Sequence, residues 1–347
     1  MKAVLFCENP YAFGILEPIM NVLKEQGDEF LWFVKTPIVS KFPFVNEPHT
    51  SNMNEVAAFM SDAIFVPGNE VPYYLRGLKT QVFHGLAGEK KGHFRIRNYF
   101  DLYLTQGPFF TEGFKKLKTK TNNIEVIETG WPKLDVFGKD FAKYDQEKEA
   151  LLKEYAAKKI ILYAPTFSPS LTCAPFLLNE IEELASNKDY LVLIKFHDLM
   201  AQDLIEQYKK LASRVENIVF EDERNVIKFL LISDLMISDT SSVVYEFLLL
   251  DKPVITFKNF SKNIRWDNAL EYANVSERVK NNLEEDPFKV QRKEIYNQYH
   301  PYNDGNSALR MVTEVKKYIA EHGVPEKRKL SFWRRRKIHK IFGKLNA

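Results

Sequence analysis

Two histidines follow predicted strands, one in each half of the chain. His84 follows the predicted strand of residues 81–83. His197 ends the run Leu-Ile-Lys-Phe-His, residues 193–197, which continues the predicted strand of residues 191–194. An imidazole titrates near neutral pH, so it can accept a hydroxyl proton or stabilise a phosphate as a cation. Taken alone, either histidine is more readily explained as a structural residue. Their matched positions nevertheless make them candidates to meet across a cleft between two domains.

A cluster of hydroxyl groups follows a third predicted strand, residues 235–237. Asp239, Thr240, Ser241 and Ser242 precede a helical pattern that ends before Pro253. Hydroxyls and free backbone N–H groups at the positive end of a helix form an anion site, which phosphate commonly occupies. Glu246, one turn into that helix, is positioned to reach the ribose hydroxyls of a nucleotide. The structural alternative is an ordinary helix cap, a role that serine and threonine often fill.

A fourth strand, residues 159–163, ends in Ala-Pro-Thr-Phe-Ser. Thr166 and Ser168 are available there as donors to a phosphate or a base, although a strand ended by a proline would give the same pattern. The dedicated phosphate loop, the nucleophile elbow and the dinucleotide fingerprint are all missing from the sequence. The nearest approach to an acidic metal motif, residues 221–223, is more simply a charged turn. We therefore predict group transfer without a metal or other cofactor, in which positioning and electrostatics carry the catalysis.

Strands and helices alternate along the chain, which predicts α/β architecture with parallel sheets. Around residues 139–145 the sequence becomes charged and weakly apolar, and we place a domain boundary there. The prediction is two Rossmann-like, doubly wound domains that face each other across a cleft, residues 1–140 and 141–322. A late helix, residues 307–319, can cross back to brace the first domain. The carboxyl ends of the strands, where ligands bind in such sheets, carry all the candidate residues.

The composition is that of a two-domain protein that is soluble or at most peripheral on a membrane. The 347 residues are 45% hydrophobic, and no apolar run approaches the length of a membrane span. The first residues read as a strand and not as a signal peptide. The two cysteines, Cys7 and Cys173, lie far apart in apolar surroundings, which fits a reducing cytoplasm better than a disulfide framework.

Positive charge is concentrated in a C-terminal tail, residues 323–347. From residue 325 onward there are nine lysines or arginines and one glutamate. Ile338, Ile341, Phe342 and Leu345 form one helical stripe opposite the basic residues, a pattern typical of an interfacial anchor on anionic lipid. A solvated basic tail is the alternative, and nucleic-acid binding is a weaker one. We predict contact with an anionic membrane surface and no nucleic-acid partner.

Five motifs in fixed order resemble those of the CDP-glycerol glycerophosphotransferase family, the teichoic-acid primases and polymerases. They are His-Gly at residue 84, Tyr-Ala-Pro-Thr at residue 163, Lys-Phe-His at residue 195, the long stretch from residue 238, and Asp-Gly-Asn-Ser at residue 304. The resemblance covers roughly residues 80–320. It implies the GT-B fold, which agrees with the two-domain reading of the element order.

The resemblance also implies roles for individual residues. His84 is similar to the general base for the acceptor hydroxyl, and His197 to the histidine that contacts the pyrophosphate and stabilises departing CMP. The residues that would hold the donor nucleotide or its phosphates are Thr166, Ser168, Asp239, Thr240, Ser241, Ser242 and Glu246, and those on the acceptor side are Gly85, Lys90 and Lys91. The sequence departs from the family pattern at three positions. Leu86 replaces a threonine, Asp198 a proline, and Glu246 the more usual aspartate.

The activity implied is transfer of glycerol phosphate, or a related alditol phosphate, from a CDP-activated donor. The acceptor is a hydroxyl on a lipid-linked saccharide or polymer, CMP is released, and the setting is the inner face of the cell membrane. Two alternatives remain open from the sequence. One is a glycosyltransferase or nucleotide-sugar 2-epimerase of the same fold, and the other is an inactive membrane-bound scaffold for envelope assembly.

Overall fold

The computed structural model describes residues 1–86, 88, 93–118, 124–139, 141–223, 226–262 and 264–345. Lys90 and Lys91, predicted on the acceptor side, lie outside these residues. The chain forms two compact units. Unit 1 comprises Met1–Lys139 and Gln298–Ala347, and unit 2 comprises Asp140–Asn297.

Unit 1 is built on a seven-stranded parallel sheet with the order β3-β2-β1-β4-β5-β6-β7, which is a Rossmann arrangement. Its strands are β1 Lys2–Cys7, β2 Glu29–Val34, β3 His49–Thr50, β4 Ala63–Val66, β5 Leu78–Gln81, β6 Leu102–Thr105 and β7 Glu125–Glu128. Its helices are α1 Phe13–Glu25, α2 Met53–Ala58, α3 Pro108–Lys118, α4 Val136–Lys139, α12 Ser307–His322 and α13 Phe332–Phe342. All residues of β4, β5 and β6 are buried, as expected for a parallel sheet covered on both faces.

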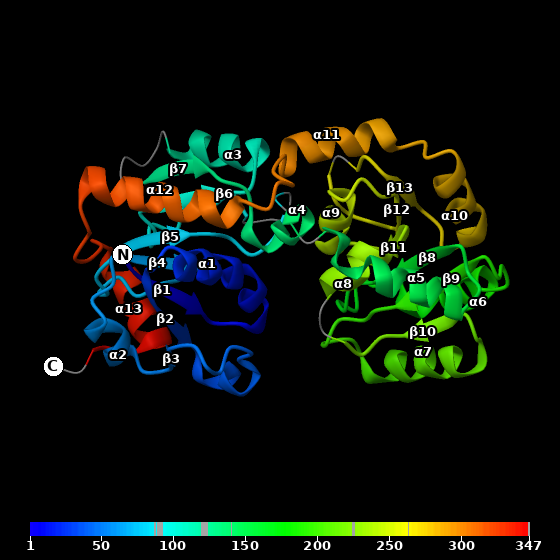
Figure 1. The fold of residues 1–347 in the computed structure, drawn as a ribbon, viewed down its shortest axis with the longest axis horizontal. Coiled ribbons are helices and arrows are strands. Elements are labelled where there is room, and N and C mark those ends of the chain that lie inside the picture. The colour runs from blue at the N-terminus through cyan, green and yellow to red at the C-terminus, as the bar shows by residue number, and fades with distance from the viewer. Residues whose placement is uncertain are drawn as a thin grey trace. The chain divides into compact units, whose positions relative to one another are not determined.

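Unit 2 contains a six-stranded parallel sheet with the order β10-β9-β8-β11-β12-β13. The strands are β8 Lys159–Tyr163, β9 Tyr190–Ile194, β10 Ile218–Phe220, β11 Leu235–Ser238, β12 Val254–Phe257 and β13 Asp267–Ala269. The helices are α5 Asp145–Glu154, α6 Leu178–Leu184, α7 Gln202–Arg214, α8 Val226–Ile232, α9 Val243–Leu248 and α10 Val275–Glu284, and α11 Lys289–Tyr299 leads back to unit 1. The predicted α/β class with two Rossmann-like domains is confirmed (Figure 1).

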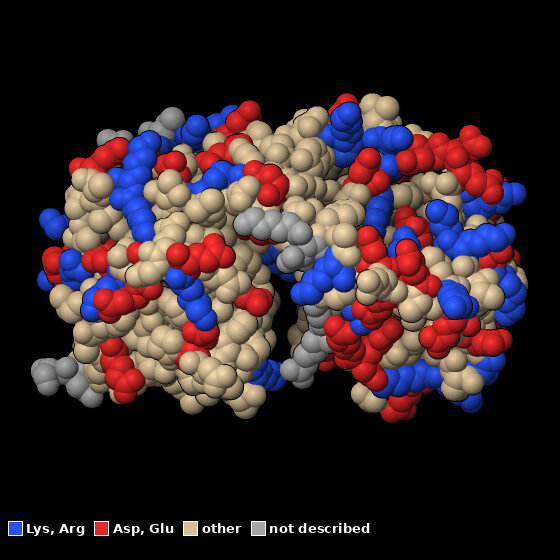
Figure 2. Space-filling view, in the orientation of Figure 1, with Lys and Arg blue, Asp and Glu red and all other residues tan. Residues whose placement is uncertain are grey.

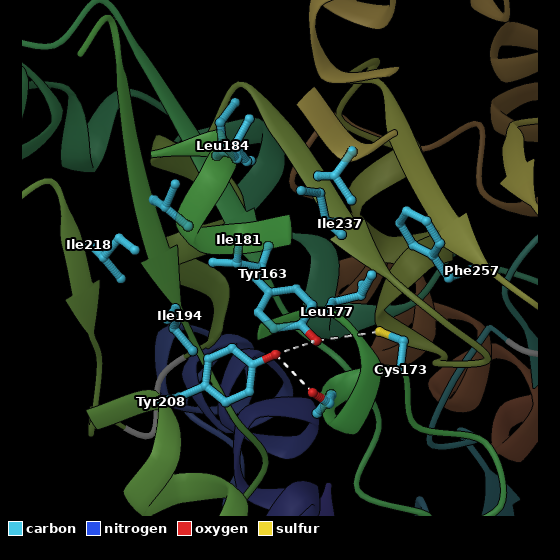
Figure 3. Packing of buried hydrophobic residues seen from close by; sticks show 14 of the residues in the cluster. Tyr163, Cys173, Leu177, Ile181, Leu184, Ile194, Tyr208, Ile218, Ile237 and Phe257 are labelled. Carbon is cyan, nitrogen blue, oxygen red and sulfur yellow. Dashed lines mark hydrogen bonds between the residues drawn. The ribbon is translucent and has the colours of Figure 1, made fainter. Parts of the chain in front are cut away.

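The core of unit 2 contains a small polar network among its apolar side chains (Figure 3). The Tyr208 hydroxyl donates to the Ala174 carbonyl over 2.8 Å, and the Tyr163 hydroxyl lies 3.4 Å from that of Tyr208. The Cys173 sulfur lies 3.5 Å from the Tyr163 hydroxyl. Burial raises the pKa of both Tyr163 and Cys173 well above the usual values. The Cys173 thiol therefore packs as a neutral core group and not as a nucleophile.

One predicted strand lies three residues from its observed position. We predicted residues 81–83, whereas β5 covers Leu78–Gln81. The reason is Lys79, a polar residue that is fully buried in the strand. Its Nζ donates to the carbonyls of Leu75 and Gly77 at 2.7 and 2.9 Å, and burial lowers its pKa to about 8. A lysine satisfied in this way interrupts the apolar pattern without interrupting the strand.

The predicted second domain, residues 141–322, extends too far. Residues 298–347 pack with unit 1, because α12 is fixed to that unit at both ends. The Asp135 carboxylate accepts the backbone N–H groups of Ser307 and Ala308 at 2.8 Å, and Lys316 pairs with Asp28 at 2.6 Å. Figure 1 shows α12 and α13 beside the strands of unit 1. The late helix therefore braces the first domain in the way we expected of it.

The tail is a folded part of unit 1 and not an appendage. Ile338 is fully buried in a core cluster, and the Phe342 ring packs against Phe6 with centroids 5.4 Å apart. The apolar stripe that we assigned to lipid is thus engaged by the protein itself. The apolar side chains that α13 exposes are Phe332 and Trp333, at 69% and 73%. These two rings and the exposed basic residues of α13 are what the described part of the tail offers for a membrane contact.

None of the described helices is long and apolar enough to span a membrane. On the face that Figure 2 shows, acidic and basic side chains are interspersed over both units.

Candidate active site

His84 is held at the carboxyl edge of the unit 1 sheet by a bend in the backbone. Phe83 has φ +59°, in the left-handed region that a bulky residue rarely adopts. The Phe83 ring is buried and packs against Phe114, with centroids 5.0 Å apart. Core packing therefore holds the strained residue in place and turns His84, which is exposed, away from the strand direction.

The hydrogen bond of His84 fixes which ring nitrogen is available. Nδ1 lies 2.9 Å from the Pro67 carbonyl oxygen, which can only accept, so Nδ1 carries the proton. Nε2 of the neutral ring is then an unprotonated acceptor, as a general base requires. The Tyr11 ring lies 5.3 Å from the His84 ring and limits its movement. The Gly85 carbonyl accepts from Gln106 Nε2 at 2.9 Å, which fixes the backbone that follows.

In His197 of unit 2, the two ring nitrogens have the opposite hydrogen-bonding roles. Its Nδ1 accepts the backbone N–H of Leu199 at 3.1 Å, so the neutral ring carries its proton on Nε2. Burial lowers the pKa of His197, and nearby Lys195 lowers it further although Asp198 opposes this. The Phe167 ring packs against it with centroids 4.5 Å apart. The exposed His197 therefore presents an N–H donor, suited to a phosphate oxygen.

Asp239 organises the loops of unit 2 instead of facing solvent. It is fully buried, and its two carboxylate oxygens accept the backbone N–H groups of Thr166 and Cys173, each at 2.9 Å. Burial raises its pKa to about 6, although both hydrogen bonds act in the opposite direction. Asp239 thus ties the loop after β8 to the end of β11. The sequence pattern placed this residue at the site without revealing these two backbone contacts.

The hydroxyl cluster itself is half-exposed at the end of β11. Thr240 Oγ1 accepts the backbone N–H of Phe260 at 3.1 Å. Ser242 precedes α9, but its side chain makes no capping hydrogen bond. Because α9 has only six residues, its dipole adds less to phosphate binding than the sequence pattern suggested. The half-exposed Thr240, Ser241 and Ser242 remain available as donors.

Thr166 and Ser168 are half-exposed on the loop after β8, and the Ser168 carbonyl accepts two backbone N–H groups that close this loop. Glu246 is only 5% exposed, in the first turn of α9. Its predicted contact with a ribose remains a prediction.

Near the unit 2 site, the sequence analysis missed Asn259 and named Lys195 only as part of the Lys-Phe-His motif. Asn259 Nδ2 donates to the Asp239 carbonyl at 2.7 Å, and the exposed Phe260 follows it. Lys195 is buried with its Nζ on the Phe196 carbonyl at 2.7 Å, and burial lowers its pKa. Both Asn259 and Lys195 follow apolar strands, so the rule that identified the histidines could have found them. Among the described residues, no three His, Cys, Asp or Glu side chains gather in a way that would hold a metal ion.

Two Rossmann-type sheets, each with polar groups at its carboxyl edge, define an α/β protein with the GT-B fold. A solved structure of the wall teichoic acid polymerase TagF, in a variant form, is similar to this fold, and the match covers 92% of this chain and 89% of that chain. The TM-score is 0.66 and the sequence identity 18%. The family described as CDP-Glycerol:Poly(glycerophosphate) glycerophosphotransferase matches residues 79–265, more than half of the chain. The chain therefore belongs to this family.

Two curated relatives illustrate the range of named substrates. The teichoic acid ribitol-phosphate polymerase TarL of Staphylococcus aureus is 34% identical over 188 residues, 49% of this chain and 32% of that protein. The teichoic acid poly(glycerol phosphate) polymerase of Bacillus spizizenii is 24% identical over 264 residues, 69% of this chain and 60% of that protein. The chain thus matches about a third to three fifths of the length of these relatives.

Proposed function

We propose that this protein transfers an alditol phosphate, glycerol phosphate or ribitol phosphate, from a CDP-activated donor to a hydroxyl of a lipid-linked cell-wall polymer precursor, with release of CMP. Family membership supports the reaction class. The observation that carries the proposal is the opposite use of ring nitrogens by two exposed histidines. His84 presents a proton acceptor and His197 a proton donor, which are the two groups that a phosphoryl transfer to a hydroxyl needs.

In the proposed reaction, the acceptor oxygen attacks the β-phosphorus, which carries the alditol. His84 Nε2 takes the hydroxyl proton as the new P–O bond forms. The bond between the β-phosphorus and the bridging oxygen breaks, and CMP leaves with that oxygen. His197 Nε2–H donates to the leaving phosphate, and Ser241 and Ser242 bind the donor phosphates. Because burial lowers the pKa of His197, the ring acts in this step as a neutral N–H donor.

A panel of donors tests the proposal and separates it from the alternatives. The purified protein is incubated with CDP-glycerol, CDP-ribitol and UDP-sugars together with a lipid-linked acceptor, and released nucleotides are quantified. We expect CMP only with the CDP-alditols and only when acceptor is present. UDP release or epimer formation without CMP would replace the proposal with a glycosyltransferase or epimerase. No nucleotide release with any donor would favour the alternative of an inactive scaffold.

We further propose that the protein works at the cytoplasmic membrane surface, through an anionic-lipid contact of the tail. The support is an exposed aromatic pair, Phe332 and Trp333, next to the exposed Arg335 and Arg336. Aromatic rings and arginines together favour the interface of an anionic bilayer. A lipid-linked acceptor would be reached at that surface.

A further inference from the structure

A charged cluster lies at the same sheet edge as His84 and has no role in the reaction proposed above. Four strand-end or loop residues and one tail residue form it: Glu8 after β1, Tyr11, Lys35 after β2, Glu70 after β4, and Lys337 of α13. Lys35 Nζ lies 3.5 Å from Glu8 Oε1, and Lys337 Nζ lies 2.6 Å from Glu70 Oε1. All five residues belong to unit 1.

The turn that holds His84 connects this cluster to the candidate base. The Pro67 carbonyl accepts a hydrogen bond from Nδ1–H of His84, and Gly68 follows Pro67 directly. The Glu8 carboxylate lies so close to Gly68 that a Cβ added there would be 2.8 Å from Glu8 Oε2. Tyr11, whose ring packs against His84, also interacts electrostatically with Glu8. Glu8 and His84 therefore flank one turn at the edge of the sheet.

Glu8 is unusual because it is a carboxylate kept largely out of solvent. Its side chain is 12% exposed. Burial is the largest of the effects that raise its pKa to about 7; Glu70 adds to this increase, whereas Lys35 and Lys337 oppose it. A largely desolvated carboxylate with one loose ion pair costs the fold stability, and groups of this kind are common at functional sites. Its chemistry, as an acceptor of hydrogen bonds beside a base, matches the hydroxyl groups of a polyol.

We propose that Glu8 is an acceptor-positioning residue, whose carboxylate accepts a hydrogen bond from a polyol hydroxyl of the acceptor next to the one that His84 deprotonates. This inference rests on the proposed transfer reaction and adds an acceptor subsite to it. The tail contributes through Lys337, which pairs with Glu70 and so reduces the repulsion that Glu70 exerts on Glu8.

Kinetics with two varied substrates tests the assignment. We expect Glu8→Gln to raise the KM for the acceptor roughly ten- to hundredfold, since a charged hydrogen bond is lost, with the donor KM unchanged within about twofold. Gly68→Ala keeps the carboxylate but displaces it and should raise the acceptor KM as well. The matched control is Glu29→Gln, an exposed glutamate at the start of β2. An acceptor KM of Glu8→Gln equal to that of Glu29→Gln would overturn the inference.

The contribution of Lys337 is tested against a second lysine of the same helix. Lys337→Ala should raise the acceptor KM at pH 7, and Lys340→Ala, which removes the same charge from an exposed position of α13, should not. Equal effects of both variants would assign the role of Lys337 to the general charge of the tail.

A binding measurement separates failure of this inference from failure of the proposed function. Calorimetric titration with a short soluble poly(glycerol phosphate) chain, in the absence of donor, needs no turnover. Binding to the wild type that weakens in Glu8→Gln would support the subsite even if no CMP were released. Equal binding to both proteins, or binding to neither, would contradict it.

Discussion

His84 and His197 use opposite ring nitrogens in their protein contacts, and this difference assigns them different chemistry. Nδ1–H of His84 donates a hydrogen bond to a carbonyl oxygen, whereas Nδ1 of His197 accepts one from a backbone N–H. Each contact lies within its own unit and is local in sequence or in the sheet. The roles that we propose for the two histidines therefore rest on the nearest neighbours of each ring.

Replacement by glutamine should distinguish the two roles. An amide can donate an N–H but cannot take up a proton, so His197→Gln should keep more activity than His197→Ala. His84→Gln should be as inactive as His84→Ala, with a loss of about 10²- to 10⁴-fold in kcat. The measurement is kcat from CMP release at saturating donor. If His84→Gln retained activity and His197→Gln did not, the two assignments would have to be exchanged.

The raised pKa of Glu8 predicts how stability depends on pH. Its ordinary value is 4.5 and its value in the fold is about 7, so the folded state binds the proton more tightly than the unfolded state. The contribution of Glu8 to stability is therefore lost as pH rises from about 4.5 to about 7. At pH 8, Glu8→Gln should increase the free energy of unfolding by about 1–3 kcal/mol, and near pH 4 the difference should vanish.

Urea unfolding from pH 4 to pH 8 checks this expectation, with Glu29→Gln as the control. A variant that is more stable than the wild type yet binds acceptor less well is what a functional carboxylate predicts. A Glu8→Gln protein that was less stable at pH 8 would mean that Glu8 supports the fold.

The sequence allowed most candidate residues to be located, because in a parallel sheet the residues after each strand share one edge. It did not show what each residue contacts. Asp239 looked like a ligand contact and instead accepts two backbone N–H groups. Glu8 follows a strand like the others, but its carboxylate lies close to Gly68 and is influenced by the charge of Lys337, whose partner Glu70 is 267 residues away in the chain. Local patterns carry no record of contacts at that separation.

Among the elements, α13 shows the largest difference between what the sequence predicted and what the structure shows. Its amphipathic pattern predicted an anchor, but amphipathicity shows only that one face is covered. The structure shows unit 1 covering it, with Ile338 in the core and Tyr73 hydrogen-bonded to His339 at 3.1 Å. Removing the tail would therefore damage the fold as well as any membrane contact, so truncation is a poor test.

Two single substitutions in α13 should separate folding from membrane contact. Ile338→Ala should lower the free energy of unfolding by about 2–4 kcal/mol, because it leaves a cavity in the core. Trp333→Ala should change it by no more than about 0.5 kcal/mol, because the ring is 73% exposed. Urea unfolding provides both values. Similar losses in the two variants would contradict the packing of α13 described above.

Lipid binding should depend on the two exposed rings and not on Ile338. In sedimentation with anionic vesicles, Phe332→Ala combined with Trp333→Ala should reduce the bound fraction several-fold. Folded Ile338→Ala should bind like the wild type. Unchanged sedimentation of the double variant would remove the proposed membrane contact.

At the scale of the whole molecule, the fold class was predictable, because the alternation of strands and helices is a local signal repeated along the chain. The late helix was also expected to brace the first domain, but the residue at which the second unit ends was not predicted. The return of residues 298–347 to unit 1 depends on Asp135 and Asp28, which no pattern around residue 300 reveals. The relatives include both ribitol-phosphate and glycerol-phosphate polymerases, so family membership is compatible with either alditol in the donor.

Donor binding should stabilise the folded protein. At a donor concentration of about 100 times Kd, linkage predicts an increase of about 2.7 kcal/mol in the free energy of unfolding. We expect the melting temperature to rise with CDP-glycerol or CDP-ribitol and not with UDP-sugars. The combined Ser241→Ala and Ser242→Ala variant should lose most of the shift. A full shift in that variant would place the donor elsewhere.

Mass spectrometry of the acceptor tests the central claim most directly. After incubation with a CDP-alditol and a lipid-linked acceptor, the wild-type protein should add the mass of one or more alditol phosphates to the acceptor. One CMP should appear for each unit added, and His84→Ala should give neither product. Release of CMP with an unchanged acceptor, or equal products from His84→Ala, would contradict the account.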